Sequence, residues 1–104
     1  MPHPGDPAAA QILVWILATH EDPDLPSAAE TVAMAEQMAK SAQDQSPAIL
    51  DILAASYARA GRFPEAVQSA TKAIDLAREQ KAPELAAEIE ARRKLYEGGK
   101  PYLK

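Results

Sequence analysis

The sequence predicts an all-α protein of five helices, and two observations carry this prediction. The first is composition, because the 104 residues are rich in alanine, poor in β-branched residues, and hold only four glycines. The second is periodicity, because apolar residues recur every three or four positions in five segments separated by short breaks. A chain of this length forms one domain, so any function lies on a single surface.

The first two helices are expected to begin at capping residues. Asp6 is placed to cap a helix that has Pro7 in its first position and runs to about Thr19. The acidic, proline-containing stretch that follows cannot continue this helix. Ser27 and Glu30 then form an S-x-x-E capping box that opens the second helix.

Serine, proline and glycine bound the other three helices. Proline suits the first turn of a helix, serine caps its start, and glycine suits the turn that ends it. These signals predict a third helix from Ser46-Pro47 to Gly61, a fourth from Pro64 and a fifth from Pro83, which Gly98-Gly99 ends.

The first four helices form two similar halves. Paired helices of this length, joined by turns of a few residues, are antiparallel hairpins. Two short motifs recur between the halves, Ile16-Leu17-Ala18 as Ile52-Leu53-Ala54 at an offset of 36 residues and Val32-x-x-Ala35 as Val67-x-x-Ala70 at an offset of 35. Pro47, which starts the third helix, recurs as Pro83 at the start of the fifth, again at an offset of 36.

The second hairpin, residues 47–80, spaces small and large side chains for close helix packing. The positions concerned are Leu50, Leu53, Ala54, Tyr57, Ala66, Ala70 and Ala73, with the turn Gly61-Arg62-Phe63. In this pattern the hairpin resembles the tetratricopeptide (TPR) repeat, a helix–turn–helix unit of 34 residues. It departs from that pattern at Arg78, where the family usually has proline.

The resemblance implies a short right-handed α-solenoid of two helix–turn–helix repeats plus a capping helix. The first repeat is a degenerate copy, in which Glu21 replaces the hairpin tyrosine. The capping helix is expected to turn Leu85 and Ile89 inward. Its charged residues Glu88, Glu90, Arg92, Arg93 and Lys94 are expected to face water. The expected boundaries are 1–6 for a disordered tether, 7–97 for one TPR-like domain (8–43, 47–80 and the cap 84–97) and 98–104 for a flexible tail resembling that of bacterial multi-repeat proteins.

The resemblance also implies a binding site. In TPR proteins the first helix of each pair lines a concave face, which here is an apolar floor with acidic edges. Such a groove suits a peptide with aliphatic anchors and nearby Lys or Arg. It does not suit a C-terminal carboxylate, because the Lys and Asn of the clamping subgroup are absent. The expected groove residues are Ile12, Trp15, Ile16, Thr19, Asp51, Ile52, Ala55, Arg59, Glu84 and Glu88.

Three of these residues have simpler interpretations. Trp15 also suits packing within the domain, or contact with a preceding repeat or a second copy of the chain. Asp51 also suits a solvated helix face. Arg59 also suits an ion pair with a nearby acid, or the dipole at a helix C-terminus.

Charge and composition narrow the partner class. The net charge of −4 argues against nucleic acid, and no apolar run approaches the roughly 20 residues of a membrane span. Residues 1–52 hold eight acids and one base, while residues 53–104 hold seven acids and ten bases. This asymmetry favours head-to-tail association or, more simply, reflects uneven solvated faces. The chain has no cysteine, its first residues do not resemble a signal peptide, and its compartment stays open.

No residue set predicts catalysis, a metal or a cofactor. His20 with Glu21, Asp22 and Asp24 is the one conceivable metal cluster, but its spacing matches no closed ligand motif. A histidine that caps a helix C-terminus is the simpler interpretation. His3 lies in the expected tether, and the serines have no base nearby in sequence.

Two hypotheses of different classes follow. In the first, the chain is a non-catalytic scaffold that binds a protein or peptide on the concave face. In the second, it is a structural module that self-associates or stacks within a longer TPR array and has no free peptide ligand. Two hairpins and a cap are fewer than the three repeats that a stable array usually has, which favours the second hypothesis somewhat.

Overall fold

The computed structural model describes residues 7–20 and 27–102 of the chain. Within these residues it contains five α-helices and no strand, which confirms the all-α prediction. The expected tether 1–6, including the capping role of Asp6, lies outside the described residues. The helices are α1 (Pro7–Thr19), α2 (Ala28–Ser41), α3 (Pro47–Arg59), α4 (Phe63–Glu79) and α5 (Pro83–Glu97).

Two serines cap helices as the sequence predicts. The Oγ of Ser27 accepts a hydrogen bond from the Glu30 amide at 3.2 Å, and the Oγ of Ser46 accepts one from the Ile49 amide at 3.3 Å. Both satisfy an N–H group that has no partner inside the helix. Helices α4 and α5 begin without a side-chain cap and rely on a proline in their first turn.

Helices α2 to α5 all end in the same backbone turn. At each end a residue adopts a positive φ, and the next amide donates to the carbonyl five residues back at 2.8–2.9 Å, as in the Schellman motif. Glycine suits this conformation because it has no Cβ. These positive-φ residues are Gln43 (55°), Gly61 (79°), Lys81 (59°) and Gly99 (72°), and at the end of α2 the following residue, Asp44 (54°), has a positive φ as well.

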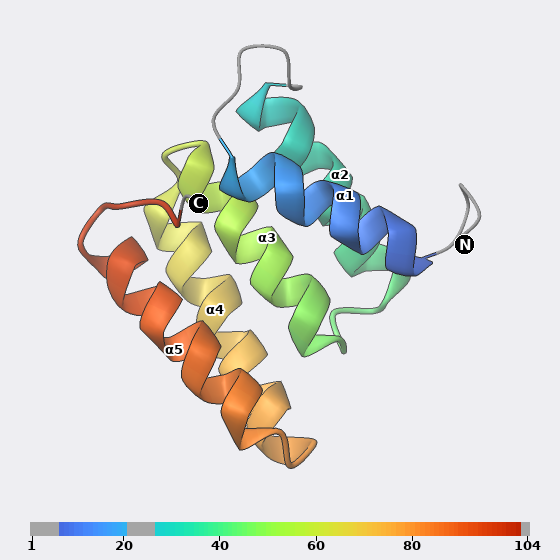
Figure 1. The fold of residues 1–104 in the computed structure, drawn as a ribbon, viewed down its shortest axis with the longest axis vertical. Helices are drawn as coiled ribbons and strands as arrows, with labels where there is room; N and C mark the ends of the chain where they lie inside the picture. Colours follow the sequence, from blue (N-terminus) through green and yellow to red (C-terminus); the bar gives the residue numbers. More distant parts are fainter. Residues whose placement is uncertain (1–6, 21–26, 103–104) are drawn as a thin grey trace.

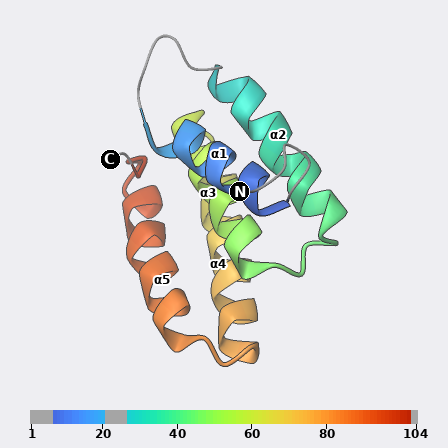
Figure 2. The ribbon, with the colours of Figure 1, turned by 45° about the vertical axis from the view of Figure 1, so that its right-hand side comes forward.

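Helix α3 lies at the centre of the molecule. It packs along α4, which in turn packs along α5, while α1 and α2 both pack on α3 and more lightly on each other. Figures 1 and 2 show α3, α4 and α5 side by side, with α1 crossing α3 at one end. The molecule measures 35 × 32 × 21 Å along its principal axes.

Fully buried alanines line the contacts between helices, because a methyl group lets two backbones approach closely. Ile74, Ile89 and Tyr96 fill the larger spaces. Of the positions read from residues 47–80, the two leucines and the alanines are buried as expected, Tyr57 and Phe63 are half-buried, and Gly61 and Arg62 in the turn are exposed. The alanines with no exposed surface are Ala18, Ala35, Ala54, Ala66, Ala70, Ala73 and Ala77.

In the described part of the chain, every helix is too short or too polar to cross a lipid bilayer.

Candidate functional site

Four of the ten expected groove residues are buried. Thr19 is 0% exposed, Ala55 1%, and Asp51 and Ile52 are each 6% exposed. Three of them lie on α3, which other helices cover on several sides. The prediction of an open groove lined by these side chains is therefore corrected, because they contact the interior of the protein.

The exposed residues of the expected groove stay on separate helices. Ile12 and Ile16 are 59% and 41% exposed on α1, whereas Glu84 and Glu88 are exposed on α5. The exposed part of the set therefore consists of apolar side chains on α1 and acidic side chains on α5. Glu88 still lies close enough to Asp51 for its charge to raise the pKa of that carboxyl.

Arg92 on α5 contacts side chains of both α1 and α3. Its Nε donates to Oδ1 of Asp51 at 3.0 Å, and its Nη2 donates to Oδ2 of the same carboxylate at 2.7 Å. Only 13% of the Arg92 side chain is exposed, so the expectation that it faces water is wrong. A fork of two parallel hydrogen bonds holds the guanidinium in one orientation. Helical spacing alone groups Arg92 with the charged residues that face water, and it does not indicate that Asp51 is the partner.

Two aromatic rings lie against the same guanidinium. The Arg92 Cζ is 5.2 Å from the ring centre of Trp15 and 5.4 Å from that of Tyr102, which are cation–π distances. The two ring centres are 5.7 Å apart. Tyr102 is half-buried and packs against the core, although the sequence assigns it to a flexible tail. We call Trp15, Asp51, Arg92 and Tyr102 the aromatic–arginine cluster.

Burial controls the ionisation of this cluster. It raises the pKa of Asp51 above its ordinary value, and the hydrogen bonds from Arg92 only partly offset that effect. Burial is the largest influence on Arg92 and by itself would lower its pKa, but the hydrogen bonds and charge of Asp51, together with Tyr96 and Tyr102, make the net shift upward. Burial also raises the pKa of Tyr96, with a further contribution from the Asp51 charge. The two shifts reflect one largely buried salt bridge between Arg92 and Asp51.

The end of α1 is held by side chains that the sequence places in the groove. Arg59 Nη1 donates to the Leu17 carbonyl at 2.8 Å, in the last turn of α1, and Thr19 Oγ1 donates to the Trp15 carbonyl at 2.8 Å. His20 Nδ1 lies 3.0 Å from the Ile16 carbonyl, which can only accept a hydrogen bond. Arg59 and His20 thus act at a helix C-terminus.

The one conceivable metal cluster, around His20, cannot be assembled from the described residues. Glu21, Asp22 and Asp24 lie outside them. In residues 7–20 and 27–102, no group of three or more His, Cys, Asp or Glu side chains is placed to hold a metal ion.

An apolar groove of about 580 Å³ lies between α1, α2 and the start of α3. Leu13 is 53% exposed at its edge, and half-buried Met34, Met38 and Ile49 line it. Its polar rim consists of Gln11, Gln37 and Ser41. We call this the α1–α2 groove. The sequence offered one signal for it, the i, i+4 pair of methionines beyond the buried stripe of α2.

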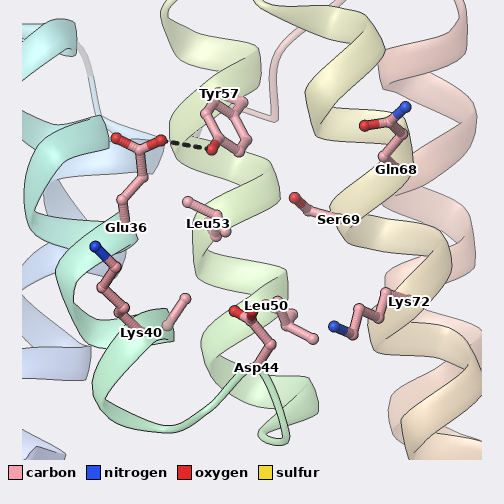
Figure 3. A pocket seen from close by; sticks show the side chains of 10 residues that line it. Glu36, Lys40, Asp44, Leu50, Leu53, Tyr57, Gln68, Ser69 and Lys72 are labelled. Atoms are coloured by element: carbon pink, nitrogen blue, oxygen red, sulfur yellow. Dashed lines mark hydrogen bonds between the residues drawn. The ribbon is translucent and has the colours of Figure 1, made fainter.

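A second hollow of about 360 Å³ lies between α2 and α4, over α3 (Figure 3). Leu50 and Leu53 form its floor, and the Tyr57 hydroxyl donates to Glu36 Oε2 at 2.7 Å across its upper end. This bond joins α3 to α2. Charged side chains of both signs surround the floor, from Lys40, Asp44 and Lys72.

Comparisons of the chain with models of protein families, with curated proteins and with solved structures find no match.

Proposed function

We propose that this chain is a TPR-like protein-interaction module, without catalytic activity, that holds a helix of another protein in the α1–α2 groove. The observation that carries the proposal is the exposed apolar surface beside and within that groove. Leu13 and its neighbour Ile12 are both more than half exposed. A contiguous apolar surface of this kind, bordered by polar residues, is typical of an interaction site.

The shape and chemistry of the groove favour a helix as the bound element. It runs between two helices, and amphipathic helices are commonly bound in such grooves through residues at i, i+3 and i+4. Met34 and Met38 line it, and the flexible thioether side chain adapts to differently shaped partners. The proposed contact is therefore apolar packing in the groove, with hydrogen bonds at the glutamine and serine rim.

Charge favours a basic partner over a second copy. All the residues that line the groove come from the acidic half of the chain, residues 1–52, which holds eight acids and a single base, Lys40. Glu30 lies one helical turn before Met34 and is exposed, so an acid lies in line with the groove. Two such surfaces face to face would repel, whereas Lys or Arg beside an aliphatic stripe complements the charge. We therefore propose an amphipathic helix with aliphatic anchors and basic flanks.

The solenoid arrangement and the TPR relationship belong to the same proposal. The spacing of residues 47–80 and the burial of their small side chains support them. The alternative of self-assembly is supported by exposed Ile12 and Ile16 on α1, which a second copy would cover.

The test uses a designed helical peptide of about 18 residues, with leucines along one face and lysines elsewhere, and the same pattern with glutamate for lysine. We expect the lysine peptide to bind in titration calorimetry and the glutamate peptide to bind at least about tenfold more weakly, since charge sets partner preference. Leu13→Asp is expected to weaken binding about tenfold or more, because an acid then lies against the apolar peptide face.

Leu95→Asp is the matched control, since Leu95 is a 37% exposed leucine on α5, away from the groove. It is expected to leave binding unchanged, with circular dichroism confirming the helix content of both variants. Equal binding of the two peptides would overturn the charge argument. A dimer in sedimentation velocity that Leu13→Asp abolishes would favour self-assembly instead.

A further inference from the structure

The C-terminal segment of the chain returns to α1. After α5 the backbone turns at Gly99, which has a φ of 72°, and the segment then runs toward the end of α1 (Figure 1). There the ring of Tyr102 contacts Trp15 and Arg92. A segment outside the helices is thus bound to the aromatic–arginine cluster through one side chain that follows a proline, Pro101.

The cluster is organised to bind an aromatic ring. Asp51 holds the guanidinium of Arg92 in one orientation by two hydrogen bonds. An aromatic ring can therefore pack against the guanidinium without a further cost in side-chain entropy. One ring, Trp15, belongs to α1 and forms part of the fold. The other, Tyr102, is contributed by a short segment that a backbone turn connects to α5. The cluster therefore has a fixed part and an occupant.

We propose that Trp15, Asp51 and Arg92 form a recognition site for a proline–aromatic segment of another polypeptide, and that Tyr102 is its internal occupant. The partner class is read from the occupant, which presents an aromatic ring after proline. This site is separate from the α1–α2 groove and does not depend on it. The internal occupant limits access, because a partner has to displace Tyr102.

The strength of that competition follows from the tether. A segment attached by a short linker acts on its site at an effective concentration of the order of millimolar. A free peptide of the same sequence must exceed that concentration to compete in the unmodified chain. Removing the ring of Tyr102 removes the competitor and leaves the fixed part of the cluster intact.

The experiment uses the full chain with Tyr102→Ala and, as probe, the blocked peptide Gly-Gly-Lys-Pro-Tyr, which repeats residues 98–102. Trp15 is the single tryptophan and reports directly on the site. We expect a saturable change in Trp15 fluorescence in the variant, and at least a tenfold higher peptide requirement in the unmodified chain. The peptide with alanine in place of tyrosine is the matched control and is expected to give no change.

A folded Tyr102→Ala variant that shows no response at several millimolar peptide would overturn the proposal and make Tyr102 a packing residue only. If that variant does not fold, the unmodified chain decides, because peptide at ten times the effective concentration must still change Trp15 fluorescence. Concentration-dependent association that Tyr102→Ala abolishes would show that the occupant is exchanged between copies, and would also overturn it.

Discussion

Asp51 on α3 and Arg92 on α5 are joined by two parallel hydrogen bonds, although 41 residues separate them in sequence. Helix α5 packs mainly along α4, so this ion pair fastens it directly to the central helix. Both side chains are largely buried, at 8% and 13% exposure. Removing one partner leaves the other as an uncompensated charge in a poorly solvated place.

Asp51→Ala is accordingly expected to lower the free energy of unfolding by about 3 kcal/mol. Urea denaturation monitored by circular dichroism measures it. Arg78→Ala is the control, because Arg78 pairs with Glu90 at 3.6 Å on an exposed surface. That variant is expected to lose less than about 0.5 kcal/mol. Similar losses in the two variants would contradict the structural role of the buried pair.

Tyr57 provides a pH prediction. Burial and its hydrogen bond to Glu36 raise the pKa of Tyr57 from 10.0 to about 12. Because the folded pKa is above the unfolded one, this contribution to stability is complete below pH 10 and is lost as the pH rises from 10 to about 12. Absorbance titration of the tyrosinates detects this group.

Glu36→Gln removes the charge and the carboxylate acceptor, so the pKa of Tyr57 is expected to fall. It should stay above 10.0, since burial is the largest cause. The Tyr57→Phe variant lacks this phenol, so the part of the absorbance titration that it loses belongs to Tyr57. An unchanged titration in Glu36→Gln would show that the hydrogen bond does not influence the phenol.

The hydroxyl of Tyr96 is buried and has no hydrogen-bond partner among the described residues. An unsatisfied buried hydroxyl costs about 1–3 kcal/mol. Tyr96→Phe is therefore expected to leave the free energy of unfolding unchanged or to raise it. Tyr96→Ala creates a cavity and is expected to lower it by at least about 3 kcal/mol. A marked loss in Tyr96→Phe, by thermal or urea unfolding, would reveal a partner for the hydroxyl.

Ile52 and Ile12 are both expected groove residues, but their exposures are 6% and 59%. Ile52→Ala removes packed methyl groups and is expected to cost about 2–5 kcal/mol of stability. Ile12→Ala is expected to change stability by less than about 0.5 kcal/mol. Chemical denaturation measures the free energy of unfolding of both variants. Small, equal losses of stability in the two variants would show that Ile52 is exposed and not part of the core.

The turns at Gly61 and Lys81 share a positive φ, of 79° and 59°. A Cβ added at Gly61 would meet nothing within 4 Å, so Gly61→Ala measures backbone strain alone. It is expected to lower stability by about 1 kcal/mol, and Lys81→Gly to raise it by up to the same amount. Differential scanning calorimetry would show the opposite shifts in melting temperature. Shifts of the same sign would contradict the shared geometry.

Much of the fold could be predicted from local signals. Ser27, Ser46 and the helix-starting prolines act within one turn of where they stand, so the helix boundaries follow from sequence order. The positive-φ turn at Lys81 could not be predicted in this way. Lysine gives no sign of that conformation, which backbone hydrogen bonds impose.

The site was less predictable because it depends on contacts between distant residues. Asp51 and Arg92 both occupy positions that helical periodicity alone assigns to a solvated face. Only the crossing of α1, α3 and the C-terminal segment brings them together with Trp15 and Tyr102. The apolar α1–α2 groove was missed for a related reason, since Met34 and Met38 suit a core as well as a surface.

Helices α2 to α5 end with the same backbone hydrogen bond, and this has a consequence for how the chain tolerates substitution. Backbone atoms alone close each of them, and the left-handed position accepts glutamine, glycine or lysine. The path of the chain is thereby largely independent of the side chains that the helices present to solvent. Residues of surfaces such as the α1–α2 groove can therefore be substituted without changing the turns that connect the helices. Binding specificity can change in this way while the fold stays the same.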